Sequence, residues 1–185
     1  MIDFIKSNKP FFVFLAKFLS IYLGMSLLYA VYLNCYDSKT FEVDSFTKQV
    51  SIQTKNVLIF FGEDAAISKH PSDASYKLAL NGKVVARVIE GCNALSVMIL
   101  FAAFVFAFSA TFKKTSLFVL FGAILIHVLN IFRIVLLTLA LYHYPEHKEL
   151  LHGTIFPLFI YGVVFFLWII WLTKFSGYVT KNIAE

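Results

Sequence analysis

Three reactive side chains stand beside long apolar segments of the chain: Cys92, Arg133 and His152. A cysteine becomes nucleophilic as the thiolate, and both a helix N-terminus and a nearby cation favour that form. Cys92 stands at the start of an apolar run, Arg133 can supply the cation, and His152 can carry protons near neutral pH. A cysteine with a histidine points to covalent acyl transfer through a thioester. Arg133 can also stabilise an oxyanion or hold the substrate carbonyl.

Each of these residues also has a simpler interpretation. Arg133 could only extend its charged end to the membrane interface, and His152 could be an interfacial residue at a helix start. Glu90 and Asn93 surround Cys92 with polar groups, which packing alone does not require. Glu90 either orients His152 or Arg133, or it lies in water.

The segment "HVLNIFRIV" places His127, Asn130 and Arg133 within an arc of about 120° on one helix face. Polar side chains within a membrane span are costly and are functional candidates. We therefore expect this face to look into the helix bundle. We interpret His127 as an interior histidine with a satisfied hydrogen bond.

Metal and redox sites are disfavoured by the cysteine and histidine patterns. The two cysteines, Cys35 and Cys92, form neither a metal-ligand spacing nor a CxxC pair. His143 and His147 could form a metal or haem cluster with His152, but a short polar segment favours solvated histidines. We predict no metal and no cofactor. A Cys35–Cys92 disulfide remains an alternative, because both residues are expected on the oxidising side of the membrane.

The composition is that of a membrane protein. The 185 residues are 59% hydrophobic and 15% charged, with 22 Phe, and the mean hydropathy is +0.78. A soluble domain of this size carries far more charge. The formal net charge of +5 is too small and too scattered for a nucleic-acid-binding surface.

Four segments are long and apolar enough to cross a bilayer about 30 Å thick, at about residues 10–33, 94–112, 116–142 and 154–173. The expected fold is an all-α integral membrane protein with four transmembrane helices. The first segment is interpreted as a retained signal anchor, because its apolar run is long and no cleavage site follows.

Lysines near the ends of these spans set the expected orientation. They form three clusters on one side if the spans alternate: Lys6 and Lys9, Lys113 and Lys114, Lys174 and Lys181. The positive-inside rule makes that side cytoplasmic, with both chain termini.

The segment 34–91 is then an extracytoplasmic loop. Residues 48–61, "KQVSIQTKNVLIFF", partly alternate and are predicted to form a half-buried strand. Asn81-Gly82 between two short strand-like runs predicts a β-hairpin. This hairpin could deliver Glu90, Gly91 and Cys92 to the membrane surface, or the loop could be a cap without chemistry of its own.

The lysines also allow a depth estimate at about 1.5 Å per helical residue. Cys92 comes out about 31 Å from Lys113, Arg133 about 28 Å from Lys114, and His152 about 33 Å from Lys174. Three reactive side chains from three spans are thus expected together at the outer interface.

These residues resemble the exosortase/archaeosortase family of integral-membrane cysteine transpeptidases. The resemblance is carried by "EGCNAL" around Cys92, "NIFRI" around Arg133 and "HGTIFPLFIYG" from His152. It covers roughly residues 85–175, and more loosely a single membrane domain over 1–185. The short, four-span layout resembles the compact F-type exosortases of Bacteroidetes bacteria. Many relatives have glycine where this chain has Ala94.

The resemblance implies a function and its partners. The substrates would be exported proteins with a C-terminal motif, a membrane helix and a basic tail, and the acyl group would pass to water or an envelope acceptor. Cys92 would be the nucleophile, Arg133 the electrostatic stabiliser and His152 the general acid/base, with Asn130 orienting. The expected location is the bacterial inner membrane, with the active site facing the periplasm.

The alternative is a non-enzymatic four-helix membrane protein, such as an assembly partner or a transporter. A transporter should place its polar groups near the middle of the membrane. Only His127 is expected at that depth, which argues mildly against a transporter.

Overall fold

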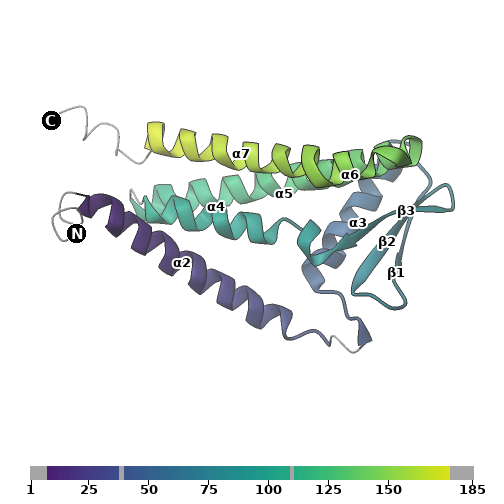
Figure 1. Ribbon diagram of the computed structural model, residues 1–185, viewed down its shortest axis with the longest axis horizontal. Coiled ribbons are helices and arrows are strands. Elements are labelled where there is room, and N and C mark those ends of the chain that lie inside the picture. Colours follow the sequence, from purple (N-terminus) through teal and green to yellow (C-terminus); the bar gives the residue numbers. More distant parts are fainter. Residues whose placement is uncertain (1–7, 38–39, 109–110, 176–185) are drawn as a thin grey trace.

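The structure, a computed structural model, describes residues 8–37, 40–108 and 111–175. The long helices run side by side, and a small α/β unit lies at one end of this bundle (Figure 1). The elements in chain order are α2 (Lys9–Leu33), α3 (Ser45–Phe60), β1 (Ala65–Lys69), β2 (Ser75–Leu80), β3 (Lys83–Ile89), the 3-10 turn η2 (Glu90–Cys92), α4 (Leu95–Ala107), α5 (Phe112–His143), η3 (Pro145–His147), α6 (Lys148–Leu150), η4 (Leu151–Ile155), α7 (Phe156–Ile170) and η5 (Trp171–Phe175).

Three helical segments of the described chain are long and apolar enough to cross a membrane: Lys9–Leu33, Phe112–His143 and Pro145–Phe175. The protein is therefore a mostly helical membrane protein, as predicted. The predicted span 94–112 is represented by α4, which has 13 residues and a length of about 20 Å. This length is below the hydrocarbon thickness of about 30 Å.

Four of the six lysines that predict the orientation are described, and they lie at one end of the bundle. Figure 1 shows the start of α2, the start of α5 and the end of η5 at the end opposite the sheet. Lys9, Lys113, Lys114 and Lys174 belong to these helix ends. Lys6, Lys181 and both chain termini lie outside the described residues.

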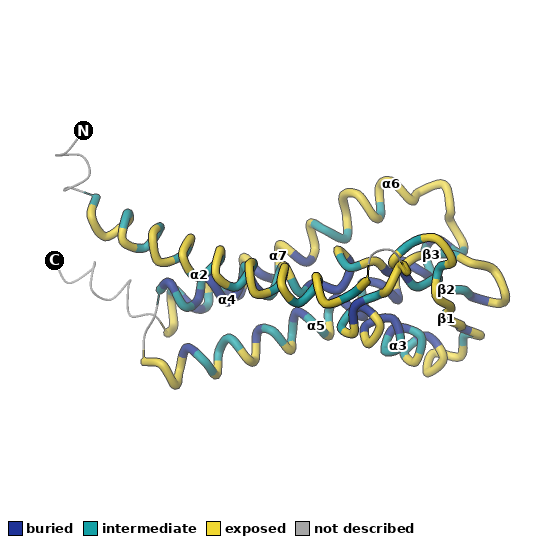
Figure 2. Tube along the Cα trace, turned by 90° about the horizontal axis from the view of Figure 1, so that it is seen from below, coloured by how far each residue is buried: buried dark blue, intermediate teal, exposed yellow. Residues whose placement is uncertain are grey.

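Helix α2 contacts the bundle mainly through aromatic rings. Phe14 stacks on Phe108 with ring centroids 4.0 Å apart, and Phe14 and Phe18 both pack edge-on against Phe104. No residue of α2 is fully buried, and Figure 2 shows exposed residues along its whole length. Such exposure of an apolar helix fits contact with lipid on most of its surface.

Helices α4 and α5 pack closely at a glycine. A methyl group added to Gly122 of α5 would lie 2.3 Å from the Phe101 ring of α4. Phe101 is completely buried, so its ring has little room to move away. A residue without a side chain at position 122 therefore allows the two helices to approach each other.

The prediction of a strand at 48–61 is wrong, because this segment belongs to helix α3. Asp44 caps the helix by accepting a hydrogen bond from the Thr47 N–H at 2.9 Å. The buried residues recur at helical spacing, and they are Thr47, Val50, Ser51, Thr54 and Leu58. Three of these five carry hydroxyl groups, so the buried face is not an apolar stripe in the sequence.

Two of those hydroxyl groups bond within α3 itself. Ser51 donates to the Thr47 carbonyl and Thr54 donates to the Val50 carbonyl, both at 2.8 Å. Their polarity is satisfied without leaving the helix, so the face can be buried.

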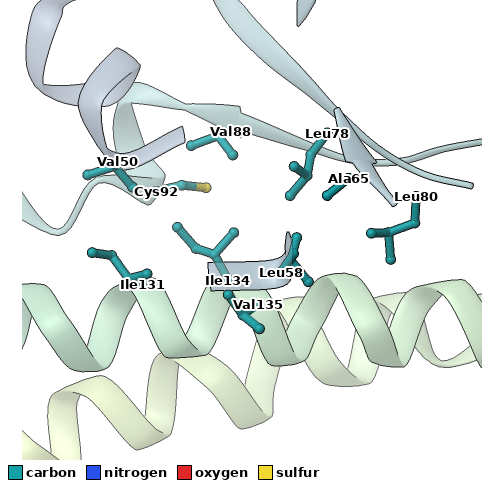
Figure 3. Packing of buried hydrophobic residues seen from close by; sticks show 10 residues of the cluster. All are labelled: Val50, Leu58, Ala65, Leu78, Leu80, Val88, Cys92, Ile131, Ile134 and Val135. Atoms are coloured by element: carbon teal, nitrogen blue, oxygen red, sulfur yellow. The ribbon is translucent and has the colours of Figure 1, made fainter. Parts of the chain in front are cut away.

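The loop 34–91 thus folds as a helix and a sheet with a shared hydrophobic core. The three strands form an antiparallel sheet in the order β1-β2-β3. Figure 3 shows side chains from α3, the sheet and α5 meeting in one cluster that also contains Cys92. Helix α5, at 32 residues, is about 48 Å long and exceeds the membrane thickness. Its C-terminal part therefore extends beyond the membrane and packs against the α/β unit.

Strands β2 and β3 are joined at Asn81-Gly82, where both residues have positive φ, 49° and 76°. Such values are those of a two-residue type I′ turn. The Asn81 side-chain amide donates to the Tyr142 hydroxyl at 3.3 Å. The hairpin tip is thereby bonded to the end of α5, and β3 runs from that tip back to Cys92.

Candidate active site

Cys92 ends a tight turn between β3 and α4. The turn η2 spans Glu90–Cys92, and Ala94 follows with a left-handed backbone, φ 64° and ψ 10°. The Cys92 side chain is 9% exposed. In Figure 3 its sulfur lies between Val88 of β3 and Ile134 of α5. The cysteine thus stands just before the N-terminus of α4.

Asn93 holds this turn through three hydrogen bonds. Its Oδ1 accepts from the Leu95 N–H at 2.8 Å, and its Nδ2 donates to the Thr47 Oγ1 at 3.0 Å and to the Tyr29 hydroxyl at 3.4 Å. Asn93 is only 1% exposed. Because Thr47 belongs to α3 and Tyr29 to α2, one side chain connects the cysteine turn to two other helices.

Glu90 does not orient Arg133 or His152 in the structure. Its carboxylate accepts a short hydrogen bond from the Tyr29 hydroxyl. It therefore fixes the turn from the α2 side, together with Asn93.

Asn130 joins the cysteine turn to Arg133. Its Nδ2 donates to the Cys92 carbonyl at 2.8 Å, and its Oδ1 accepts from the Arg133 Nη1 at 3.1 Å. Asn130 has no exposed surface. Its side-chain amide therefore donates one hydrogen bond and accepts the other. The orienting role of Asn130 stays a prediction.

Arg133 is half-buried and retains a free donor. Among the described residues, its Nε has no hydrogen-bond partner although the atom is buried. Arg133 also lies near Cys92 and Tyr161. A buried guanidinium donor without a partner is costly, and a substrate carbonyl or oxyanion could satisfy it.

His152 lies in the π-helical turn η4, Leu151–Ile155. Pro157 follows in the first turn of α7, and a proline lacks the N–H that would bond to the carbonyl of Gly153. The wider turn fits this missing bond. His152 is exposed, and within residues 8–37, 40–108 and 111–175 no hydrogen bond holds its ring.

Cys92, Arg133 and His152 line one cavity of about 390 Å³. The cavity lies between β3 on one side and α5, α6 and η4 on the other. Its remaining lining residues are Val84, Val85, Ala86, Arg87, Val88, Ile89, Ile134, Leu137, Leu141 and Lys148. The three sequence-predicted residues are therefore brought together. Glu90, Asn93 and Asn130 do not line the cavity but support its walls.

The cationic residues of the cavity are Arg87, Arg133 and Lys148, and none of its lining residues is acidic. Arg87 is paired with Asp73 at 2.9 Å. Lys148 and His152 are four residues apart and share a helix face. The cavity wall formed by α5, α6 and η4 is thus positively charged.

The other sequence candidates lie elsewhere. The His127 Nε2 is 2.9 Å from the Gln53 Oε1 of α3. Its Nδ1 is buried and has no hydrogen-bond partner among the described residues, so the predicted satisfaction of this histidine holds for one ring nitrogen. Cys35 is exposed and Cys92 is buried, and both are free thiols. Among the described residues, no group of three or more His, Cys, Asp or Glu could hold a metal ion.

The family model described as "Transmembrane exosortase" matches residues 15–174, which is most of the chain. The chain belongs to the transmembrane exosortase family. Membership of this family indicates a membrane protease or transpeptidase. No significant match was found among curated proteins or among solved structures.

Three residues of this exosortase that surround the site were not predicted from the sequence. Tyr29 and Thr47 bond to the cysteine turn, and Lys148 lines the cavity. The four-residue spacing from Lys148 to His152 was a usable signal, since such residues share a helix face. Tyr29 and Thr47 gave no such signal, because their contacts join segments more than 40 residues apart.

Proposed function

We propose that this chain is a cysteine protease or transpeptidase working at the membrane interface, with exported proteins as its substrates. It would cleave their C-terminal sorting signals through a thioester acyl-enzyme. The observation that carries the proposal is the single cavity lined by Cys92, Arg133 and His152. Family membership supports the same class of reaction.

In the first step the Cys92 thiolate attacks the carbonyl carbon of the scissile peptide bond. The carbonyl π electrons move to the oxygen, giving a tetrahedral oxyanion. Arg133 stabilises this oxyanion, because its buried Nε has no partner among the described residues. Asn130 holds the guanidinium and the Cys92 carbonyl at a constant separation.

In the second step the C–N bond breaks and the nitrogen leaves as an amine. His152 donates the proton that this nitrogen needs, and the acyl group remains on sulfur as a thioester. Water or an acceptor amine then attacks the thioester, with neutral His152 taking its proton. The product is a carboxylic acid or a new amide, and the thiolate is regenerated.

The proposed location is the bacterial inner membrane, with cytoplasmic termini and the cavity on the periplasmic side. Helix α2 leads away from the lysine-bearing end and α5 begins at that end (Figure 1). Helix α4 with its adjoining residues must bring the chain back, which supports four crossings in one membrane domain. The compact layout is also the basis for proposing the F-type subtype.

The experiment compares Cys92→Ala with Cys35→Ala in the native host. C-terminal processing of exported proteins is followed by mass spectrometry. We expect uncleaved C-terminal tails only in the Cys92→Ala strain, with Cys35→Ala as the matched thiol control.

The alternative outcomes have definite meanings. If both variants act alike, a structural pairing of the two cysteines explains the result better. If neither variant changes processing, the enzyme proposal fails and a non-enzymatic membrane protein remains.

A further inference from the structure

Strand β3 has one edge that is not paired within the described residues. The sheet order is β1-β2-β3, and β3 pairs only with β2. Edge strands present a row of N–H and C=O groups that can pair with another chain. The register also shifts beside Val85, which has no partner across β2. Such bulges often lie next to active sites and redirect the strand.

The candidate active-site cavity follows this edge. Six consecutive residues of β3, 84–89, line it. Side chains of consecutive strand residues point to opposite faces of a sheet. A cavity that touches all six therefore runs along the strand edge rather than over one face. Figure 1 shows β3 on the α6 side of the sheet, which agrees with this placement.

We propose that the substrate's cleavage segment binds in extended form as a fourth strand on the free edge of β3. The inference rests on the proposed function in one respect, which is that Cys92 is the nucleophile. Main-chain hydrogen bonds to β3 supply the binding energy, as in other cases of strand addition. The six lining residues span about 20 Å at the usual rise of a strand.

Strand addition explains how a peptide bond reaches Cys92. Strand β3 continues through Glu90 and Gly91 directly into Cys92. The main chain of a peptide paired with β3 therefore runs alongside the strand to the Cys92 thiol. Arg133 stands on the opposite wall of the same cavity, so it faces the peptide carbonyl from the other side.

The positively charged cavity wall formed by α5, α6 and η4 should disfavour substrates with basic residues in the bound segment. Arg133 and Lys148 lie across the cavity from β3, and no acidic residue lines it. A lysine or arginine in the bound strand that faces Lys148 meets like charge, whereas a neutral or acidic residue does not. The bound segment is thus an extended peptide with a neutral or acidic side chain at that position.

The test measures alkylation of Cys92 by peptide electrophiles. The probe is a blocked peptide of six alternating Thr and Val residues that ends in a chloromethyl ketone, which the thiolate alkylates with loss of chloride. The full-length protein in lipid nanodiscs is labelled, and mass spectrometry follows each cysteine. Exposed Cys35 is the internal control, and iodoacetamide reports the reactivity of Cys92 without peptide binding.

A scan of N-methylated probes then identifies strand addition. We expect methylation of every second amide to slow Cys92 labelling about fivefold, the equivalent of one hydrogen bond. Methylation of the amides in between should change little. The rate of Cys35 labelling should not alternate with the position of the methylated amide. A uniform loss along the peptide, no loss at all, or equal probe rates at Cys35 and Cys92 would overturn the inference.

The charge selection is tested with Glu, Gln or Lys placed at each probe position in turn. We expect Lys to label about tenfold more slowly at one position, and Lys148→Glu to remove that difference. Lys77→Glu on β2, which does not line the cavity, is the matched control. Equal effects of the two variants would contradict the charge assignment. If host processing survives Cys92→Ala while labelling still alternates along the probe, the proposed function fails, and only the binding of an extended peptide along β3 remains supported.

Discussion

At the scale of single residues, the geometry around Cys92 depends on two amides. Asn93 holds the turn that carries the thiol, and Asn130 bonds both to the Cys92 carbonyl and to Arg133. Both amides are buried, so their loss would leave polar groups without partners in a medium of low dielectric. Asn130 connects the Cys92 backbone to Arg133 and is therefore the more informative residue to replace.

Replacing Asn130 with Ala should lower C-terminal processing by one to two orders of magnitude, because Arg133 loses the acceptor that holds it. The free energy of unfolding should fall by about 1–3 kcal/mol. The matched control is Thr138→Ala on the same helix, whose buried hydroxyl bonds only to the Ile134 carbonyl. Thermal unfolding and processing are measured for both variants. Equal losses of processing would mean that Asn130 acts through stability alone.

Ala94 occupies a position that suits glycine. Its φ of 64° is in the left-handed region, which costs a residue with a Cβ about 1–2 kcal/mol. Replacement by Gly relieves this cost but removes a buried methyl group worth about 0.8 kcal/mol. We expect the net change in unfolding free energy to stay within about 1 kcal/mol.

Valine at position 94 should instead destabilise the protein by more than about 2 kcal/mol, because branched residues are genuine outliers at positive φ. Thermal unfolding of the Gly and Val variants in the same detergent measures the difference. A valine variant as stable as the parent protein would contradict the assigned backbone conformation.

At the scale of elements, the helices position the site through a few close contacts. Helix α4 follows Cys92 directly, so the position of α4 along the bundle fixes the position of Cys92. Helix α4 packs against α5 where Phe101 contacts Gly122. A wider separation of these helices would pull the Cys92 carbonyl away from Asn130. The interface between α4 and α5 should therefore tolerate added volume poorly.

Two glycines of the apolar helices, Gly122 and Gly162, provide a matched pair. Gly122→Ala should lower the unfolding free energy by about 1–3 kcal/mol, because its methyl group would overlap the Phe101 ring. Gly162→Ala on α7 should have little effect, since nothing lies within 4 Å of the added methyl group. Thermal unfolding in detergent checks both variants. Equal behaviour of the two would contradict the packing of α4 against α5.

At the scale of the whole molecule, three separate parts meet at the cysteine turn. Tyr29 comes from α2, Thr47 from α3, and Asn93 follows the sheet. Helix α2 has no buried residue. It packs on α4 through aromatic rings, and its Tyr32 hydroxyl accepts from the Phe46 N–H of α3 at 3.2 Å. Its hydroxyl at position 29 links this membrane helix to the turn that carries Cys92.

Tyr29→Phe removes that link without changing the ring. We expect alkylation of Cys92 by iodoacetamide to change several-fold, because Glu90 loses its partner and the turn becomes less constrained. Tyr22→Phe is the control, since Tyr22 lies on the same helix and stacks on Phe18. Labelling of Cys35 should be the same in both variants. An unchanged rate at Cys92 would show that α2 does not control the turn.

Much of the fold could be predicted because apolar length and lysine position are local properties of the chain. The segments expected at 10–33, 116–142 and 154–173 correspond to long apolar helices. Helix α3 was mistaken for a strand because Thr47, Ser51 and Thr54 on its buried face are polar in the sequence. Only the helical geometry lets two of those hydroxyl groups bond to carbonyls one turn earlier.

The sequence by itself determined the membrane class and the three residues of the candidate site. Cys92, Arg133 and His152 are polar residues in or beside apolar helices. A polar side chain in such a place costs free energy, so it is a candidate for a functional role. The tertiary structure decided their surroundings. Asn130 reaches Cys92, Glu90 turns to Tyr29, and β3 forms one wall of the cavity. These contacts join distant segments, and their partners are chosen by how the helices and the sheet pack rather than by spacing along the chain.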